Sequence, residues 1–336
     1  MKLGAVRPIL LSLAFAFALG ACTPRLQPPG PGLRAPELTG DRLIARDGTE
    51  LPLAVWRPDG PVAAAIVALH GFNDYRNAFA TVGPALARHG IATYAYDQRG
   101  FGASPHRGIW PGDDLLVNDF ADAVDLVRAH HPGLPVHGLG ESMGGAVIMA
   151  ALAGAAAPRI DGAILAAPAV WGRRTMPAIQ VALLEVAARI MPAIAGRNEG
   201  LTYKPSDNIE MLRGLGRDTQ VIKETRIDAI YGLVGLMDRA LDAAPRLTVP
   251  TLILYGSRDD IIRSGPTCMM LHALPAKTPW RLALYSRGYH MVLRDLQAGT
   301  VLADVAAWIG AAEAPLPSGA ELPAARLSQA CPAEPG

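Results

Sequence analysis

The sequence predicts an α/β fold, with a mostly parallel central sheet and helices on both faces. Apolar segments of strand length recur along the chain, and each is followed by a segment with helical spacing. Several of these segments are apolar at nearly every position, which is typical of parallel strands buried on both faces. With 336 residues, of which 50% are hydrophobic and 18% charged, the chain can form one large core or two modest ones.

The alternation starts after an opening hairpin over residues 42–58, with Asp47 and Gly48 at its turn. We then expect strands over 63–71, 91–97, 135–142 and 160–169, and helices over 77–90, 115–133 and 143–155. The last four elements are a strand over 251–256, a helix through 268–274, a strand over 281–286 and a helix through 302–312. The folded domain is therefore expected over residues 41–312.

Residues 170–245 interrupt this rhythm. Apolar side chains recur there with helical spacing, at Ile179, Leu183, Val186 and Ile190. A second apolar stretch follows at 227–237. We expect a helical cap, inserted after the sixth strand over one edge of the sheet; additional core packing is the alternative.

The first 21 residues have the pattern of a secretory signal peptide. Lys2 and Arg7 precede an apolar run over residues 9–19, which is shorter than a typical membrane-spanning helix. Residues 19–22 (LGAC) resemble the lipobox of bacterial lipoproteins, in which the cysteine becomes the first mature residue and carries lipid. This predicts a membrane anchor on Cys22, with ordinary export and cleavage near Ala21 as the alternative.

The segments at the two ends of the domain differ from it in composition. Residues 22–40 are rich in Pro and Gly and predict a spacer, and residues 313–336 predict an irregular Pro/Ala-rich tail. Thr23, rather than Asp, follows the cysteine, which favours the periplasmic face of the outer membrane in a bacterial cell envelope. Cys268 and Cys331 remain as thiols, and an oxidising compartment permits a disulfide that the sequence leaves open.

The charge balance argues against nucleic acid as a partner. Lys plus Arg is 31 and Asp plus Glu is 30, and the basic residues are scattered. No field therefore attracts a polyanion or an acidic partner. The sequence does not indicate an oligomeric state.

Candidate catalytic residues lie where strands meet helices. Gly140-Glu141-Ser142-Met143-Gly144 matches the G-x-S-x-G nucleophile elbow, in which a strained turn presents serine at the carboxyl end of a strand. Among the eight histidines, His290 lies in the loop between the last strand and the last helix, at the same edge of the sheet. Asp259 and Asp260 both follow the preceding strand, so either is placed to orient that histidine.

Five motifs carry a resemblance to a known family. HGFNDYRN, YDQRGFGAS, GLGESMGG, YGSRDDII and GYHMVL occur in the order found in α/β-hydrolases of the monoacylglycerol lipase and lysophospholipase-like group, of the serine aminopeptidase S33 type. The resemblance covers residues 41–312 and implies an α/β-hydrolase fold. One departure is Phe101, which stands where this group often has a second histidine.

The resemblance implies a division of roles among the site residues. It selects Asp259 over Asp260 as the acid, with Ser142 as nucleophile and His290 as base. The amides of Phe72 and Met143 would form the oxyanion hole, shaped by His70 and Gly71, with Gly140 and Gly144 permitting the elbow. No metal or organic cofactor is implied.

The expected reaction is ester hydrolysis through an acyl-enzyme. A lipid-derived ester, either a monoacylglycerol or a lysophospholipid, suits an apolar cap and a membrane tether. A short-chain carboxylesterase or an aminopeptidase of the same fold is the alternative. A non-catalytic envelope lipoprotein is a further possibility from a different class.

Overall fold

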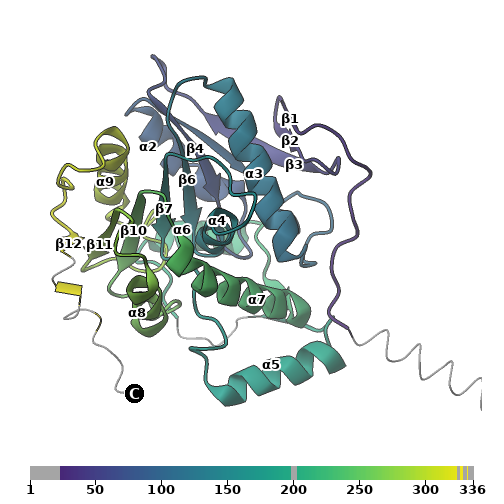
Figure 1. Cartoon of the computed structure of the whole chain (residues 1–336). Coiled ribbons are helices and arrows are strands. Elements are labelled where there is room, and N and C mark those ends of the chain that lie inside the picture. Colours follow the sequence, from purple (N-terminus) through teal and green to yellow (C-terminus); the bar gives the residue numbers. More distant parts are fainter. Residues whose placement is uncertain (1–22, 198–202, 324–325, 328–330, 332–336) are drawn as a thin grey trace, which may run out of the picture.

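The computed structural model describes residues 23–197, 203–323, 326–327 and 331 (Figure 1). Cys22 and the predicted signal segment over 1–21 lie outside the described residues. Among the helices that are described, none is both long and apolar enough to cross a membrane.

One large twisted sheet organises the described chain, and its order is β1-β2-β3-β5-β4-β6-β7-β10-β11-β12. The strands are β1 (Glu37–Thr39), β2 (Arg42–Ile44), β3 (Glu50–Trp56), β4 (Ala64–Leu69), β5 (Ile91–Tyr96), β6 (Val136–Glu141), β7 (Gly162–Ala166), β10 (Thr251–Gly256), β11 (Trp280–Tyr285) and β12 (Glu321–Leu322). The strands from β5 to β11 in this order are all parallel, and the flanking ones are antiparallel. The predicted α/β class is confirmed.

Helices cover both faces of the sheet (Figure 1). α2 (Val82–Ala87) and α9 (Ala298–Gly310) lie on one face; α3 (Asp113–His130), α4 (Met143–Leu152), α7 (Ile227–Ala243) and α8 (Ser264–Ala273) lie on the other. Side chains along β4 alternate between the two apolar clusters, since Ile66 packs with α2 and α9 while Val67 packs with the opposite layer. Each face of the sheet is therefore a separate part of the core.

Several short elements were not predicted. β1 and β12 are edge strands, and β1 raises the strand count so that the insertion follows β7. The single helix expected over 77–90 is split into the 3-10 turn Arg76–Phe79 and α2.

The insertion is largely helical, as expected, and part of it forms the alternative, which was core packing. It contains α5 (Ala178–Ile190), β8 (Ala195–Arg197), α6 (Ile209–Arg217), β9 (Glu224–Arg226) and α7. α7 packs directly on α4 and buries Leu236 and Ala240 completely. α5 lies outside α7, and most of its side chains are at least partly exposed (Figure 1). α7 thus belongs to the layer that covers the sheet, whereas α5 is an outer helix that packs on α7.

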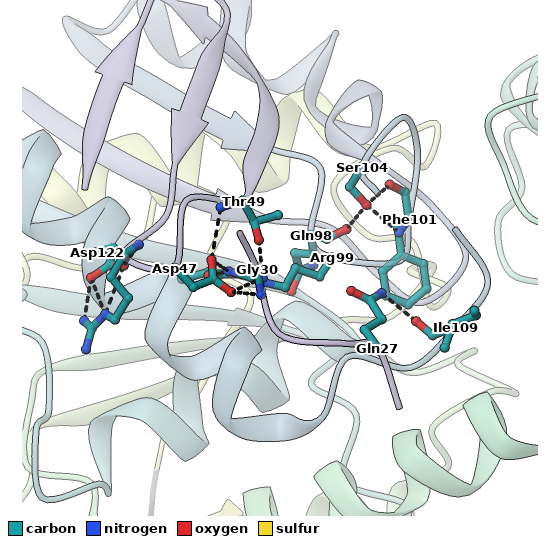
Figure 2. A network of polar contacts seen from close by, with 12 residues as sticks. Gln27, Gly30, Asp47, Thr49, Gln98, Arg99, Phe101, Ser104, Ile109 and Asp122 are labelled. Carbon is teal, nitrogen blue, oxygen red and sulfur yellow. Dashed lines mark hydrogen bonds and ion pairs between the residues drawn. The ribbon is translucent and has the colours of Figure 1, made fainter. Parts of the chain in front are cut away.

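The structure differs from the expected spacer over 22–40, because much of this segment is bonded to the domain. Gln27 donates to the backbone oxygen of Ile109 at 2.7 Å, and the amide of Gly30 donates to Asp47 at 3.1 Å (Figure 2). Asp47 is held in turn by the buried guanidinium of Arg99 at 2.8 Å. The segment is therefore a strap on the body, since its backbone amides find acceptors there.

The tail also departs from the irregular segment that was expected over 313–336. β12 pairs antiparallel with β11, placing Leu322 opposite Leu282. A disulfide joins Cys268 on α8 to Cys331. The described part of the tail is thus attached to the last strand and to a helix beside it.

Candidate active site

Ser142 stands between β6 and α4 in a strained conformation, with φ 52° and ψ −114°. L-residues rarely adopt a positive φ, so the surrounding contacts must hold it there. The turn is tight: a Cβ at Gly144 would lie 2.2 Å from the backbone oxygen of Leu69, and one at Gly140 would lie 2.4 Å from the carbonyl carbon of Gly144. Only glycine fits at either position.

Backbone hydrogen bonds to the end of β7 and to the loop after it fix the elbow. The amide of Ser142 donates to the backbone oxygen of Ala166 at 2.9 Å, and the backbone oxygen of Ser142 accepts from the amide of Ala169 at 2.9 Å. Met143 is the first residue of α4 and is fully buried. The amides at this helix N-terminus carry partial positive charge, which favours an anion beside Ser142.

Asp259 and His290 form a buried hydrogen-bonded pair at the same edge of the sheet. His290 Nδ1 lies 2.8 Å from Asp259 Oδ2, and their side chains are 6% and 0% exposed. The other oxygen of Asp259, Oδ1, accepts from the amides of Ile261 and Ile262. Asp260 is exposed, so the geometry separates two neighbours that location alone leaves equivalent.

The environment of His290 favours its charged form. Burial alone opposes that form, but the Asp259 carboxylate, by charge and by hydrogen bond, raises the pKa of His290 above its ordinary value, with a smaller contribution from Glu141. A histidine of this kind is oriented by its acid partner and can hold a proton during a reaction.

The loops that carry Asp259 and His290 are in direct backbone contact. A Cβ at Gly256 would lie 2.4 Å from the carbonyl carbon of Gly288, and the amide of Arg258 donates to the Gly288 oxygen at 2.9 Å. Sequence reasoning missed both glycines as site residues. Gly256 ends β10 and Gly288 lies two residues before His290, so their places in the sequence could have indicated them. The contact between them could not be predicted from the sequence.

The loop after β4 lies against the elbow, because a Cβ at Gly71 would be 3.4 Å from the Cβ of Ser142. His70 is fully buried behind this loop. Its Nε2 accepts from the amide of Gln98 at 3.0 Å, so its Nδ1 carries the proton and donates to the Gly71 oxygen at 2.8 Å. Burial lowers the pKa of His70, which keeps it a neutral structural residue.

Aromatic packing supports the same loop. Phe72 is partly exposed, and its ring packs edge-on against Phe101 with centroids 5.6 Å apart. Phe101 also packs edge-on against His70 at 5.6 Å. The residue that departs from the family pattern is therefore part of the wall behind the Phe72 loop. In the part of the chain that the structure describes, no group of three or more His, Cys, Asp or Glu residues is arranged to hold a metal ion.

A family model described as serine aminopeptidase, S33, matches residues 60–297. This match spans the elbow and the Asp259 and His290 loops. It covers most of the described domain and shows the family to which the chain belongs.

Curated relatives and solved structures to which the chain is similar include several lipases. The chain is 27% identical over 275 residues to a monoacylglycerol lipase of Mycolicibacterium smegmatis, covering 78% of this chain and 93% of that one. It is 26% identical over 278 residues to human monoglyceride lipase, covering 80% and 89%. A soluble variant of the Saccharomyces cerevisiae monoglyceride lipase superposes with a TM-score of 0.67 at 20% identity, covering 85% and 96%. The structural likeness supports the fold.

Proposed function

Since the chain belongs to the serine aminopeptidase S33 family of hydrolases, we propose that it cleaves monoacylglycerols through an acyl-enzyme on Ser142. It is a carboxylic ester hydrolase, and curated relatives that match most of its length are named monoacylglycerol or monoglyceride lipases. The observation that carries the proposed mechanism is the buried Asp259–His290 pair at the sheet edge where strained Ser142 is presented.

In the proposed reaction His290 accepts the proton of the Ser142 hydroxyl as its oxygen attacks the ester carbonyl. The amides of Phe72 and Met143 stabilise the oxyanion, and the carbon–oxygen bond to glycerol breaks as His290 returns the proton to the leaving oxygen. Water then attacks the acyl-enzyme with the same proton transfer and releases the fatty acid. Asp259 holds the imidazole in the tautomer that can accept the proton at Nε2.

A fluorophosphonate probe and a substrate panel test this proposal. Wild-type protein should be labelled, and Ser142→Ala should not. Within a panel of esters of increasing chain length, monoacylglycerols should be cleaved faster than acetyl or butyryl esters, lysophospholipids or aminoacyl substrates. Equal labelling of Ser142→Ala would refute the nucleophile, and a peak at short acyl chains or at aminoacyl substrates would refute the substrate class.

We also propose that lipid on Cys22 holds the enzyme at the periplasmic face of a bacterial outer membrane. The lipobox-like LGAC over residues 19–22 supports the anchor. The amide of Arg25 donates to Asp228 at 3.2 Å, so the strap reaches the domain at the start of α7. Helix α5 packs on α7, and four of its apolar side chains are more than half exposed: Ile179, Leu183, Val186 and Ile190. A nearby membrane surface would cover this face.

Two variants separate the anchor from the apolar face. Cys22→Ser should release the protein into the soluble fraction, and unchanged membrane association would refute lipid anchoring. Leu183→Asp should slow cleavage of monoacylglycerol in vesicles while leaving a soluble butyryl ester unaffected. Gln180→Asp is the matched control, because it adds the same charge at another exposed position of α5; equal losses in both variants would refute a specific role for the apolar face.

A further inference from the structure

A buried ion cluster joins the three loops of the candidate site. Arg294 follows His290 by four residues, and its side chain is 7% exposed. Its Nη2 lies 2.7 Å from Glu141 Oε2 and 2.8 Å from Asp74 Oδ2. Glu141 immediately precedes Ser142, and Asp74 belongs to the loop that contains Phe72. One guanidinium nitrogen therefore contacts the loops of the proposed nucleophile, oxyanion hole and base.

The cluster is poorly suited to stabilising the fold alone. Glu141 and Asp74 are as inaccessible as the arginine, with side chains 3% and 7% exposed. Among the described residues, Oε1 of Glu141, Nε of Arg294 and Oδ2 of Asp74 are buried without a hydrogen-bond partner, and Asp74 Oδ2 meets Arg294 only as an ion pair. Removing three charges from water is costly, and pairs of this kind are often less stabilising than apolar side chains of the same volume. The cluster is therefore better explained by the three loops that it joins than by a contribution to the stability of the fold.

The Asp74 end of the cluster anchors a strained turn. Asp74 Oδ1 accepts from the amide of Tyr75 at 2.9 Å, and the Asp74 amide donates to the Gly71 oxygen at 3.3 Å. Between them, Asn73 has φ 65°. The Asp74 carboxylate therefore anchors the backbone that follows Phe72, and the Asp74 amide closes the turn around Phe72.

The cluster also sets the charge around His290. The charged groups that act on His290 are Asp259, from the loop after β10, Glu141, from the end of β6, and Arg294, from its own loop. Asp295 on the same loop is occupied by the amide of Tyr289 and by Ser206. Glu141 favours the charged imidazole and Arg294 opposes it, so removing either one changes the balance in a known direction.

We propose that Arg294 is a positioning residue, which aligns the three loops and balances the charge of Glu141 beside His290. This inference rests on the proposed function, because it assigns Arg294 a role through His290 and Ser142. It predicts opposite effects on the pH dependence: Arg294→Leu leaves Glu141 and Asp74 uncompensated and strengthens the proton affinity of His290, whereas Glu141→Gln weakens it.

The test is the pH dependence of kcat/KM on a soluble butyryl ester. Arg294→Leu should move the acidic midpoint up by about half to one pH unit, and Glu141→Gln should move it down by a similar amount. Arg294→Lys keeps the positive charge, so its midpoint should stay at the wild-type value. The control is Arg281→Leu, which removes a partly buried arginine paired with Glu321 at the sheet edge and should leave the midpoint unchanged.

The outcomes are distinguishable even if Arg294→Leu fails to fold, since Glu141→Gln and Arg294→Lys still carry the test. Midpoints for Glu141→Gln and Arg294→Leu that stay at the wild-type value, or move in the same direction, would overturn the inference. So would an Arg294→Lys midpoint displaced upwards like that of a charge-removing variant. Full activity in Ser142→Ala would instead overturn the proposed function itself.

Discussion

Asparagine at position 259 is nearly the same size as the native aspartate, yet it should reverse the hydrogen bond to His290. The oxygen Oδ1 of Asp259 accepts two backbone amides, from Ile261 at 2.8 Å and from Ile262 at 2.9 Å. An asparagine must therefore place its oxygen there, because an NH2 group cannot accept from N–H donors. Its NH2 group then faces Nδ1 of His290.

The consequence is the wrong tautomer of the imidazole. Nδ1 becomes an acceptor, the proton moves to Nε2, and Nε2 can no longer take the proton of Ser142. Loss of the correct tautomer in a Ser-His-Asp arrangement lowers kcat about ten-thousand-fold, which corresponds to about 5 kcal/mol in the barrier. Stability should change far less, because the backbone amides keep their acceptor.

The assay is kcat on a soluble ester for Asp259→Asn and for Asp260→Asn, together with urea unfolding of both. Asp260 is exposed and is the matched control, expected to keep activity within about twofold of wild type. Residual activity above about one tenth in Asp259→Asn, or an equal loss in Asp260→Asn, would refute the assignment of Asp259 as the acid.

Three further outcomes follow from the packing. Gly256→Ala brings a Cβ to 2.4 Å from the backbone of the His290 loop and should cost about 1–3 kcal/mol in stability and about tenfold in kcat. Gly235→Ala, in the interior of α7 with nothing within 4 Å, should keep wild-type activity and gain about 0.5–1 kcal/mol in urea unfolding; equal losses in the two variants would contradict the contact. Burial lowers the pKa of His137 from 6.5 to about 4, so the unfolded chain binds this proton first on acidification, and stability should fall by about 2 kcal/mol between pH 7.5 and pH 5. A His137→Leu variant that keeps the same pH slope would refute that origin. Replacing Cys268 and Cys331 by serine removes a cross-link between residues 63 positions apart, which should lower the free energy of unfolding in urea by about 2–4 kcal/mol. An unfolding midpoint equal to that of the wild type would show that the disulfide adds no stability.

Local patterns were sufficient for the central sheet and for the order of the candidate residues. Most positions of the six parallel strands are apolar, and a run of this type has few alternatives to a doubly covered sheet. Ser142 directly follows β6 and His290 lies in the loop after β11, so their shared edge could be inferred from topology alone. Location could not rank Asp259 above Asp260 because both follow the same strand; the bond from Oδ2 to His290 does so only in three dimensions.

The remaining features depend on contacts between distant segments. The strap over the body relies on Asp47 being held by Arg99, and the Pro/Gly composition of 22–40 carries no sign of that acceptor. The ion pair between Arg294 and Glu141 spans 153 residues. β12 has only two residues, too few to show an alternating pattern. Each of these is set by a partner rather than by a local preference.

The most direct test of the central claim is to trap the intermediate that Ser142 is proposed to form. Wild-type protein is mixed with a monoacylglycerol, quenched in acid at short times and digested, and the peptides are weighed by mass spectrometry. The peptide that contains Ser142 should gain the mass of one acyl chain without glycerol, and Ser142→Ala should show neither the adduct nor turnover. Turnover without an adduct on that peptide, together with turnover in Ser142→Ala, would contradict the claim.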